Sequence, residues 1–140
     1  MTRRIGTALV ALIALAMTAG IGLGPSAATE VKTFKGVAYL SGGVGEDERA
    51  LLASATTDFP LKIVMALRSG DYLGDVRVII TNAAGQRVLD TVSEGPWLFA
   101  RLSPGTYQVR GAYAGDVLQQ TVRIGNNGQT VVMLQWPEER

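Results

Sequence analysis

The sequence predicts a mainly β protein, an antiparallel β-sandwich of seven or eight strands with one short α-helix near the N-terminus. Apolar and polar residues alternate in segments that recur as far as Trp136, as expected for strands with one buried face. Turn signals rich in Gly, Asn and Pro separate these segments at intervals of roughly 8 to 12 residues, the spacing of a sandwich or barrel. Beyond residue 28, apolar residues recur at helical spacing in one segment, residues 46–57.

The first predicted elements are a strand and a helix joined by a glycine-rich break. Residues 33–40 alternate weakly and are expected to form the strand. The run Ser-Gly-Gly-Val-Gly at 41–45 interrupts it. Three acids at 46–48 then open the helix, where they complement the positive end of the helix dipole. We expect the helix to extend to about Thr57, before Pro60.

The apolar stripe of this helix predicts which side is buried. Leu51 and Ala55 lie four residues apart, Phe59 continues the spacing, and Leu52 lies beside them. We therefore expect Leu51, Leu52 and Ala55, with Phe59 just after the helix, to pack against the sandwich or its N-terminal strand.

The remaining strands are bounded by turns. An apolar run rich in β-formers at 61–67 predicts a well-buried strand. In the turn Ser103-Pro104-Gly105, Pro pre-sets φ and Gly supplies a positive φ. After it, Tyr107 and Val109 share one face, so we expect Tyr107 to be buried with its hydroxyl bonded near a turn. The further strands are expected at 76–81, 87–92, 97–102, 107–113, 117–124 and 130–136.

The chain contains no His and no Cys. This composition excludes a Ser-His-Asp triad, a Cys nucleophile, a Cys/His zinc site and haem held by those residues. It also excludes disulfides and a lipid-modified Cys. We predict no catalytic residues, no metal site and no cofactor.

The first 28 residues have the features of a cleaved secretion signal. Arg3 and Arg4 form a basic start, a mostly apolar run extends to Met17, and Ser26-Ala27-Ala28 offers small residues for cleavage after Ala28. The apolar character ends short of the about 20 residues that a membrane span needs. The sequence therefore predicts a periplasmic protein with no membrane span after cleavage.

Charge is almost balanced along the chain. There are 13 Lys and Arg residues against 12 Asp and Glu residues, and removal of the leader with its two arginines leaves 11 against 12. A near-neutral domain without a basic run lacks the electrostatic footprint of a nucleic-acid binder. We therefore predict no nucleic-acid partner.

A recognisable pattern begins after the predicted strand at 61–67. Residues 102–109, Leu-Ser-Pro-Gly-Thr-Tyr-Gln-Val, match the pattern Leu-x-Pro-Gly-x-Tyr-x-Val, and Gly115 follows at the next turn. Upstream lie Asp-Val-Arg-Val-Ile-Ile at 75–80, Gly85, and Gly-Pro-Trp-Leu-Phe at 95–99. On these residues the segment resembles the carboxypeptidase regulatory-like domain, which implies a transthyretin-like or Ig-like β-sandwich that acts as a non-catalytic accessory. The mature chain as a whole resembles small exported proteobacterial proteins.

The resemblance suggests how the chain is organised. Residues 1–28 are the signal peptide, and residues 29–72 contribute the N-terminal strand, the helix and a buried strand packed on the sandwich. Residues 73–136 form the carboxypeptidase regulatory-like sandwich, and residues 137–140 are a tail.

The segment around the glycine-rich break is the first candidate binding site. Gly42 and Gly43 precede a helix, where bare backbone N–H groups attract anions. Tyr39, Glu46 and Arg49 flank them. However, the Lys-Ser/Thr of a nucleotide loop is missing and the acids at the helix start would repel phosphate, so a flexible connection is the competing interpretation.

The strand at 97–102 is the second candidate. Trp97, Phe99 and Arg101 share one of its faces. If exposed, they would form a stacking platform for sugar rings or an adhesive patch for a partner, and if buried they are core. Trp136 has the same two interpretations.

The sequence thus predicts a non-catalytic periplasmic binding or interaction module, which engages an envelope protein or a glycan through loops or a sheet edge. A carbohydrate-binding module that uses exposed aromatic residues is the alternative. An enzyme that uses carboxylates alone would need two carboxyl groups facing one cleft, and no such pair stands out in the sequence.

Overall fold

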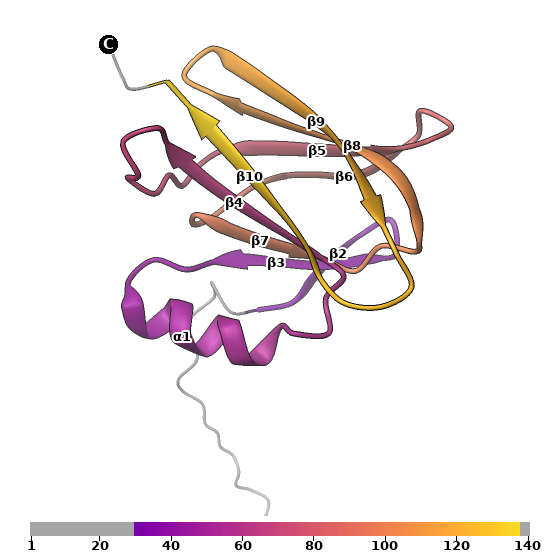
Figure 1. Cartoon of the computed structure of the whole chain (residues 1–140), viewed down its shortest axis with the longest axis horizontal. Helices are drawn as coiled ribbons and strands as arrows, with labels where there is room; N and C mark the ends of the chain where they lie inside the picture. Colours follow the sequence, from indigo (N-terminus) through magenta and orange to yellow (C-terminus); the bar gives the residue numbers. More distant parts are fainter. Residues whose placement is uncertain (1–29, 138–140) are drawn as a thin grey trace, which may run out of the picture.

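The computed structural model describes residues 30–137, which form nine β-strands and one α-helix. The strands make two sheets that face each other across an apolar core (Figure 1). The prediction of a mainly β sandwich with one short helix is confirmed. The predicted signal peptide and its cleavage site after Ala28 lie outside the described residues.

The first sheet has five strands in the order β10-β4-β7-β3-β2. They are β2 (Lys32–Phe34), β3 (Val37–Gly42), β4 (Leu61–Leu67), β7 (Trp97–Ala100) and β10 (Thr130–Trp136). Neighbours are antiparallel except β10 and β4, which run parallel with Thr130 opposite Leu61. Because β10 follows β9 of the other sheet, no tight turn determines its direction relative to β4.

The second sheet has four antiparallel strands in the order β6-β5-β8-β9. They are β5 (Arg77–Asn82), β6 (Arg87–Val92), β8 (Gly105–Tyr113) and β9 (Asp116–Ile124). Tight turns join β5 to β6 and β8 to β9. In the β8–β9 hairpin, for example, Ala114 and Gly115 both have positive φ, as a two-residue type I′ turn requires.

The strand predicted at 33–40 is in fact a hairpin. Phe34 of β2 pairs with Val37 of β3, and between them Lys35 and Gly36 have φ of 48° and 85°. Positive φ at both central residues makes this a two-residue turn of the type that joins antiparallel strands. The weak alternation continues through the turn, so the pattern indicates one strand where there are two.

The main core lies between the two sheets. Trp136 is buried in it, and its indole Nε1–H donates to the backbone carbonyl of Asp116 at 3.1 Å. Gly111 makes room for this ring, since a Cβ there would lie 2.9 Å from Trp136 Cη2. Tyr107 is also buried, and its hydroxyl donates to the carbonyl of Ser103 in the preceding turn at 2.7 Å, as predicted.

The helix α1 (Glu46–Ala55) lies on the outer side of the five-stranded sheet, beside β3 (Figure 1). It buries Leu52 against Leu40, Phe59 and Phe99, which form a second, smaller apolar cluster. The three acids occupy its first turn, as predicted.

The predicted packing of Leu51 is wrong. Leu51 is 56% exposed, whereas Leu52 is 2% exposed. The helix ends at Ala55, so Phe59 reaches the cluster from the following loop rather than along the helical stripe. The buried side of the helix therefore carries Leu52, and Thr56 continues it four residues later, just after the helix ends; both residues are buried. The side chain of Ala55 lies outside the described part.

The chain before Leu73 is built into the sandwich. The predicted buried strand 61–67 is confirmed as β4, in which every residue except Lys62 is buried. It lies between β7 and β10, so strands from both sides of Leu73 share one sheet. Five residues beyond the end of β4, Tyr72 forms an isolated antiparallel bridge with Ala66.

Candidate functional site

The two candidate segments meet where β3 pairs with β7. Gly42 is the register partner of Trp97, and Gly43 follows with φ of 96°. A Cβ on Gly43 would lie 3.4 Å from Cγ of both Arg49 and Trp97, so the backbone approaches both side chains closely. Residues that are distant in the sequence thus form one surface. We call Gly43, Arg49, Lys62, Tyr72 and Trp97 the Trp97 surface.

Lys62 and Trp97 are the centre of this surface. They project from neighbouring strands β4 and β7, and the Lys62 ammonium lies 3.7 Å from the centroid of the indole ring. A cation over the face of Trp is attracted by the ring quadrupole. Partial burial lowers the pKa of Lys62. Its ammonium makes no hydrogen bond or ion pair with the described residues, so its donors remain open to a ligand.

The indole nitrogen of Trp97 is a further unusual feature. Trp97 is half-buried, and its Nε1 atom is buried with no hydrogen-bond partner among residues 30–137. An unpaired buried N–H costs about 1–3 kcal/mol. Sites where such a cost is tolerated are candidates for functional roles.

Arg49 ties the glycine segment to the loop before β5. Its Nη1 donates to the carbonyl of Gly43 at 2.8 Å, and its guanidinium lies 4.8 Å from the centroid of the Tyr72 ring. Behind it, Glu48 Oε1 accepts the backbone N–H of Val44 at 3.1 Å. The Glu48 carboxylate already accepts a hydrogen bond from one of the backbone N–H groups that an anion would need. The geometry therefore favours a structural connection between β3 and α1 over an anion-binding loop.

The other predicted residues do not join this surface. Phe99 is buried under α1, and Tyr39 is packed against the main core, where its phenol oxygen accepts from Thr91 Oγ1 at 3.4 Å. Arg101 pairs with Asp58 at 3.2 Å, and its guanidinium lies 4.5 Å from the centroid of the Phe59 ring. Glu46 is exposed at the helix start.

The candidate aromatic platform for sugar rings is not formed. Both Phe99 and Trp136 are buried, so Trp97 is left as a single half-buried ring with Lys62 across its face. A sugar-stacking platform needs exposed coplanar rings. No observation in this region favours the aromatic carbohydrate-binding alternative.

The sequence reasoning missed the outward side chains of β10. Val131 is 58% exposed and Met133 is 49% exposed, and they are the register partners of Lys62 and Val64 on β4. Their alternation with buried Val132 and Leu134 is visible in the sequence. Because both faces of this strand carry apolar side chains, the sequence alone does not show which face is buried. We call Val131 and Met133 the β10 strip.

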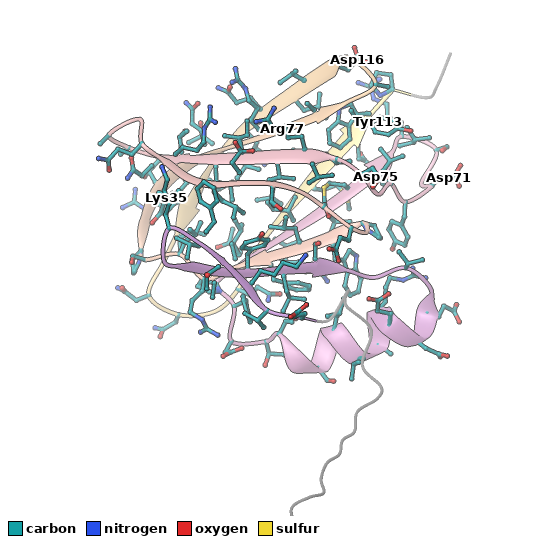
Figure 2. All side chains as sticks on the ribbon, turned by 180° about the vertical axis from the view of Figure 1, so that it is seen from behind. Lys35, Asp71, Asp75, Arg77, Tyr113 and Asp116 are labelled. Carbon is teal, nitrogen blue, oxygen red and sulfur yellow. The ribbon has the colours of Figure 1, made fainter. Side chains whose placement is uncertain are left out.

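Two further kinds of functional feature are clusters of metal-binding side chains and helices that could span a membrane. Within residues 30–137 no group of three or more His, Cys, Asp or Glu side chains is placed to hold a metal ion. In the same part of the chain, no helix combines the length and apolar character needed to cross a bilayer. Three acidic residues, Asp71, Asp75 and Asp116, lie toward one end of the sandwich, opposite the end that carries Lys35 (Figure 2).

No protein-family model matches the chain, and no curated protein matches it. The resemblance of residues 73–136 to the carboxypeptidase regulatory-like domain therefore stands on its sequence pattern.

Proposed function

We propose that this protein is a non-catalytic interaction module of the periplasm, with a carboxypeptidase regulatory-like fold, that binds a protein of the cell envelope. The observation that carries the proposal is the β10 strip, an exposed apolar pair on an edge strand beside the Trp97 surface. Exposed apolar residues grouped at an edge are typical of interaction sites.

The position of β10 suits the addition of a strand from a partner. Among the described strands only β4 pairs with it through a ladder of backbone hydrogen bonds, so its other edge has no strand partner. Unpaired backbone groups at a sheet edge are a template for an extended peptide. Apolar side chains of that peptide would cover Val131 and Met133 on the outer face.

The Trp97 surface adds polar recognition to this apolar strip. Lys62 offers unpaired N–H donors next to Val131, its register partner. A carbonyl or carboxylate oxygen of the partner would satisfy them. We therefore expect the partner segment to be extended, apolar on one face, and to carry an acid or a free carbonyl near Lys62.

Site-specific photocrosslinking in the periplasm of the producing cells tests the proposal. A photoreactive residue at position 131 should form an adduct with one envelope protein. The matched control is position 92, because Val92 is 53% exposed on an outward strand face of the other sheet. Met133→Glu and Trp97→Ala should weaken the adduct, and Val92→Glu should leave it intact.

Two results would contradict the proposal. One is equal adduct formation at positions 131 and 92, or an adduct that survives Met133→Glu in a folded protein. The other is reproducible hydrolysis of a glycan or ester by the purified protein that is lost when one carboxylate is replaced.

A further inference from the structure

The outer face of the four-stranded sheet is uncovered and strongly polar. Among residues 30–137 the single helix lies on the other sheet, so nothing packs over β5, β8 and β9 from outside (Figure 1). Strand register places one set of side chains on this outer face. We call it the arginine face. Its members include Arg77, Ile79, Thr81, Asp90, Thr106, Gln108, Arg110, Gln119, Thr121 and Arg123.

Cations outnumber anions on the arginine face, although the whole chain is nearly neutral. Asp90 is its one acid, and it is occupied by Arg77, through contacts of 3.0 and 3.2 Å, and by Arg87 at 2.9 Å. Arg110 and Arg123 make no ion pair or hydrogen bond with any residue that the structure describes. Two guanidinium groups are therefore open to an anion.

A shallow depression lies beside Arg110, and strand register places Arg123 beyond its other side. Arg110 is opposite Gln119, Gln108 is opposite Thr121, and Thr106 is opposite Arg123. The row of Thr81, Gln108 and Thr121 consequently lies between the Arg110 row and the Arg123 row.

The depression consists of two adjoining hollows. One, of about 120 Å³, is lined by Ile79, Thr81, Gln108, Arg110 and Gln119. The other, of about 400 Å³, shares Thr81 and Gln108 with it and extends to Thr121 and the β5–β6 turn. Because the hollows share Thr81 and Gln108, they adjoin each other, and the hydroxyl and amide groups of Thr81, Gln108 and Thr121 lie at their centre, with Ile79 and Tyr107 at the margins.

We propose that the arginine face binds an acidic glycan, with a sugar residue on the Thr81–Gln108–Thr121 floor and its carboxylate on Arg110. Hydroxyl and amide side chains both donate and accept hydrogen bonds, as sugar hydroxyls require. Guanidinium binds carboxylate through two parallel hydrogen bonds. This site lies on the opposite sheet from the Trp97 surface and goes beyond the protein interaction proposed above.

The spacing of the arginines favours a chain over a single sugar. Arg123 lies opposite Thr106, four residues along β8 from Arg110, which is about 14 Å at the rise of a strand. That distance exceeds one sugar ring, so Arg123 meets the acid of a second residue in the same glycan.

Other polyanions fit this face less well. Tyr107 and Tyr113, the aromatic residues of β8, lie on its inward face, and Tyr107 borders the larger hollow with 8% of its surface exposed. The arginine face therefore lacks the exposed rings on which single-stranded nucleic acids stack. The exposed Val92 and Val117 lie level with Arg77 across the strands. The row that contains Arg110 separates them from the Thr81–Gln108–Thr121 floor. The centre of the face thus offers hydrogen bonds and charge, and Ile79, which lines the smaller hollow, is half-buried and exposes little apolar surface to a membrane.

Calorimetry with the mature protein tests the inference at about 0.15 M salt, where weak surface attraction is screened. The probe is tetragalacturonate, compared with neutral galactotetraose, with polyphosphate of similar charge and with vesicles of anionic phospholipid. We expect tetragalacturonate to bind and galactotetraose not to bind. Arg110→Gln should weaken binding about tenfold or more, as for loss of a hydrogen-bonded charge.

Matched variants separate sugar recognition from charge alone. Gln108→Ala and Thr121→Val keep every charge and should still weaken tetragalacturonate binding, whereas Arg68→Gln, at an exposed loop arginine, should leave it unchanged. Met133→Glu should also leave it unchanged, which separates this site from the β10 strip.

The inference is overturned by absence of tetragalacturonate binding, or by equal binding in Arg110→Gln. It is also overturned if polyphosphate or vesicles bind as tightly and the floor variants have no effect.

Discussion

The two outer faces of the sandwich differ, although the sheets share one core. On the five-stranded sheet, Leu40 and Phe99 point outward and α1 covers them with Leu52. On the four-stranded sheet, Gln108 and Arg110 occupy outward positions and nothing in the described chain covers them. The helix thus covers the part of the outer surface where apolar residues gather around Phe99, because burial of these residues removes apolar area from water.

The apolar cluster under α1 is also smaller than the main core between the sheets. It contains four buried residues, against nineteen between the sheets. A small cluster under one helix of ten residues opens at lower cost than the main core. The regions that we assign to binding lie outside the main core: the Trp97 surface borders the small cluster, and the arginine face is solvent-exposed.

The largest expected effect comes from Phe99→Ala, which removes the buried ring against which Leu52 of α1 packs. Phe99 contacts the rings of Phe59 and Trp97 edge-on, with centroids 6.2 Å apart in both pairs. The free energy of unfolding should fall by about 3–5 kcal/mol, as for a buried aromatic truncation. Chemical denaturation measures it. Gln108→Ala, at an exposed outward position on the other sheet, should change stability by less than about 0.5 kcal/mol. Equal effects of the two substitutions would refute the contrast between the faces.

A second pair of variants tests which side of α1 is buried. Leu52→Ala should cost about 2–3 kcal/mol, at the lower end for a buried Leu because a short helix can partly settle into the gap. Leu51→Ala should cost less than about 0.5 kcal/mol, since Leu51 is 56% exposed. Thermal and urea unfolding compare the two. A larger loss for Leu51→Ala would mean that the helix is rotated relative to the structure.

A third variant examines the inner side of the four-stranded sheet. Tyr107→Phe removes the hydroxyl that donates to Ser103 but retains the ring in the core. The expected loss is about 1 kcal/mol, as for one hydrogen bond that leaves a carbonyl near solvent. Urea unfolding should show a lower midpoint with an unchanged slope. No change in midpoint would show that this bond does not anchor the Pro104–Gly105 turn.

The smallest expected effect is on the arginine face itself. Hydrogen bonds from Arg77 lower the pKa of Asp90, and Arg87 adds to this. Because the folded pKa is below the usual carboxyl value of about 3.9, the stabilising contribution is complete above that value. It is lost as the pH falls through the folded pKa. Asp90→Asn should therefore cost less than about 1 kcal/mol at neutral pH, as for a partly exposed pair.

Unfolding measurements across the acid range check this pH dependence. The difference in stability between the wild-type protein and Asp90→Asn should shrink as the pH falls below about 4. A difference that stays constant down to the lowest pH would show that the carboxylate does not contribute through its charge.

Local patterns in the sequence were sufficient for most of the elements. The apolar run at 61–67 is a buried strand, and the Pro104–Gly105 turn leads into a strand with Tyr107 bonded back to it. The acids at 46–48 occupy the first helical turn. These features depend on neighbours within a few residues, where backbone sterics and side-chain alternation act directly.

The candidate site was predictable in part. Gly42, Gly43, Arg49 and Trp97 were identified from the sequence, and the pairing of β3 with β7 brings them together. The contribution of Lys62 and the β10 strip was not predictable, because β10 and β4, which pair with each other, are separated by about half of the chain.

The sequence by itself determined that this protein is a β-sandwich with one helix, and which residues alternate between two faces of each strand. Only the tertiary structure decided which of two apolar faces is covered, that Trp136 and Phe99 are buried while Val131 and Met133 are not, and that Arg110 and Arg123 share one outer face. Alternation with period two separates the faces of a strand but is the same whichever face lies inward. The choice is made by contacts between residues far apart in the chain, which no local pattern contains.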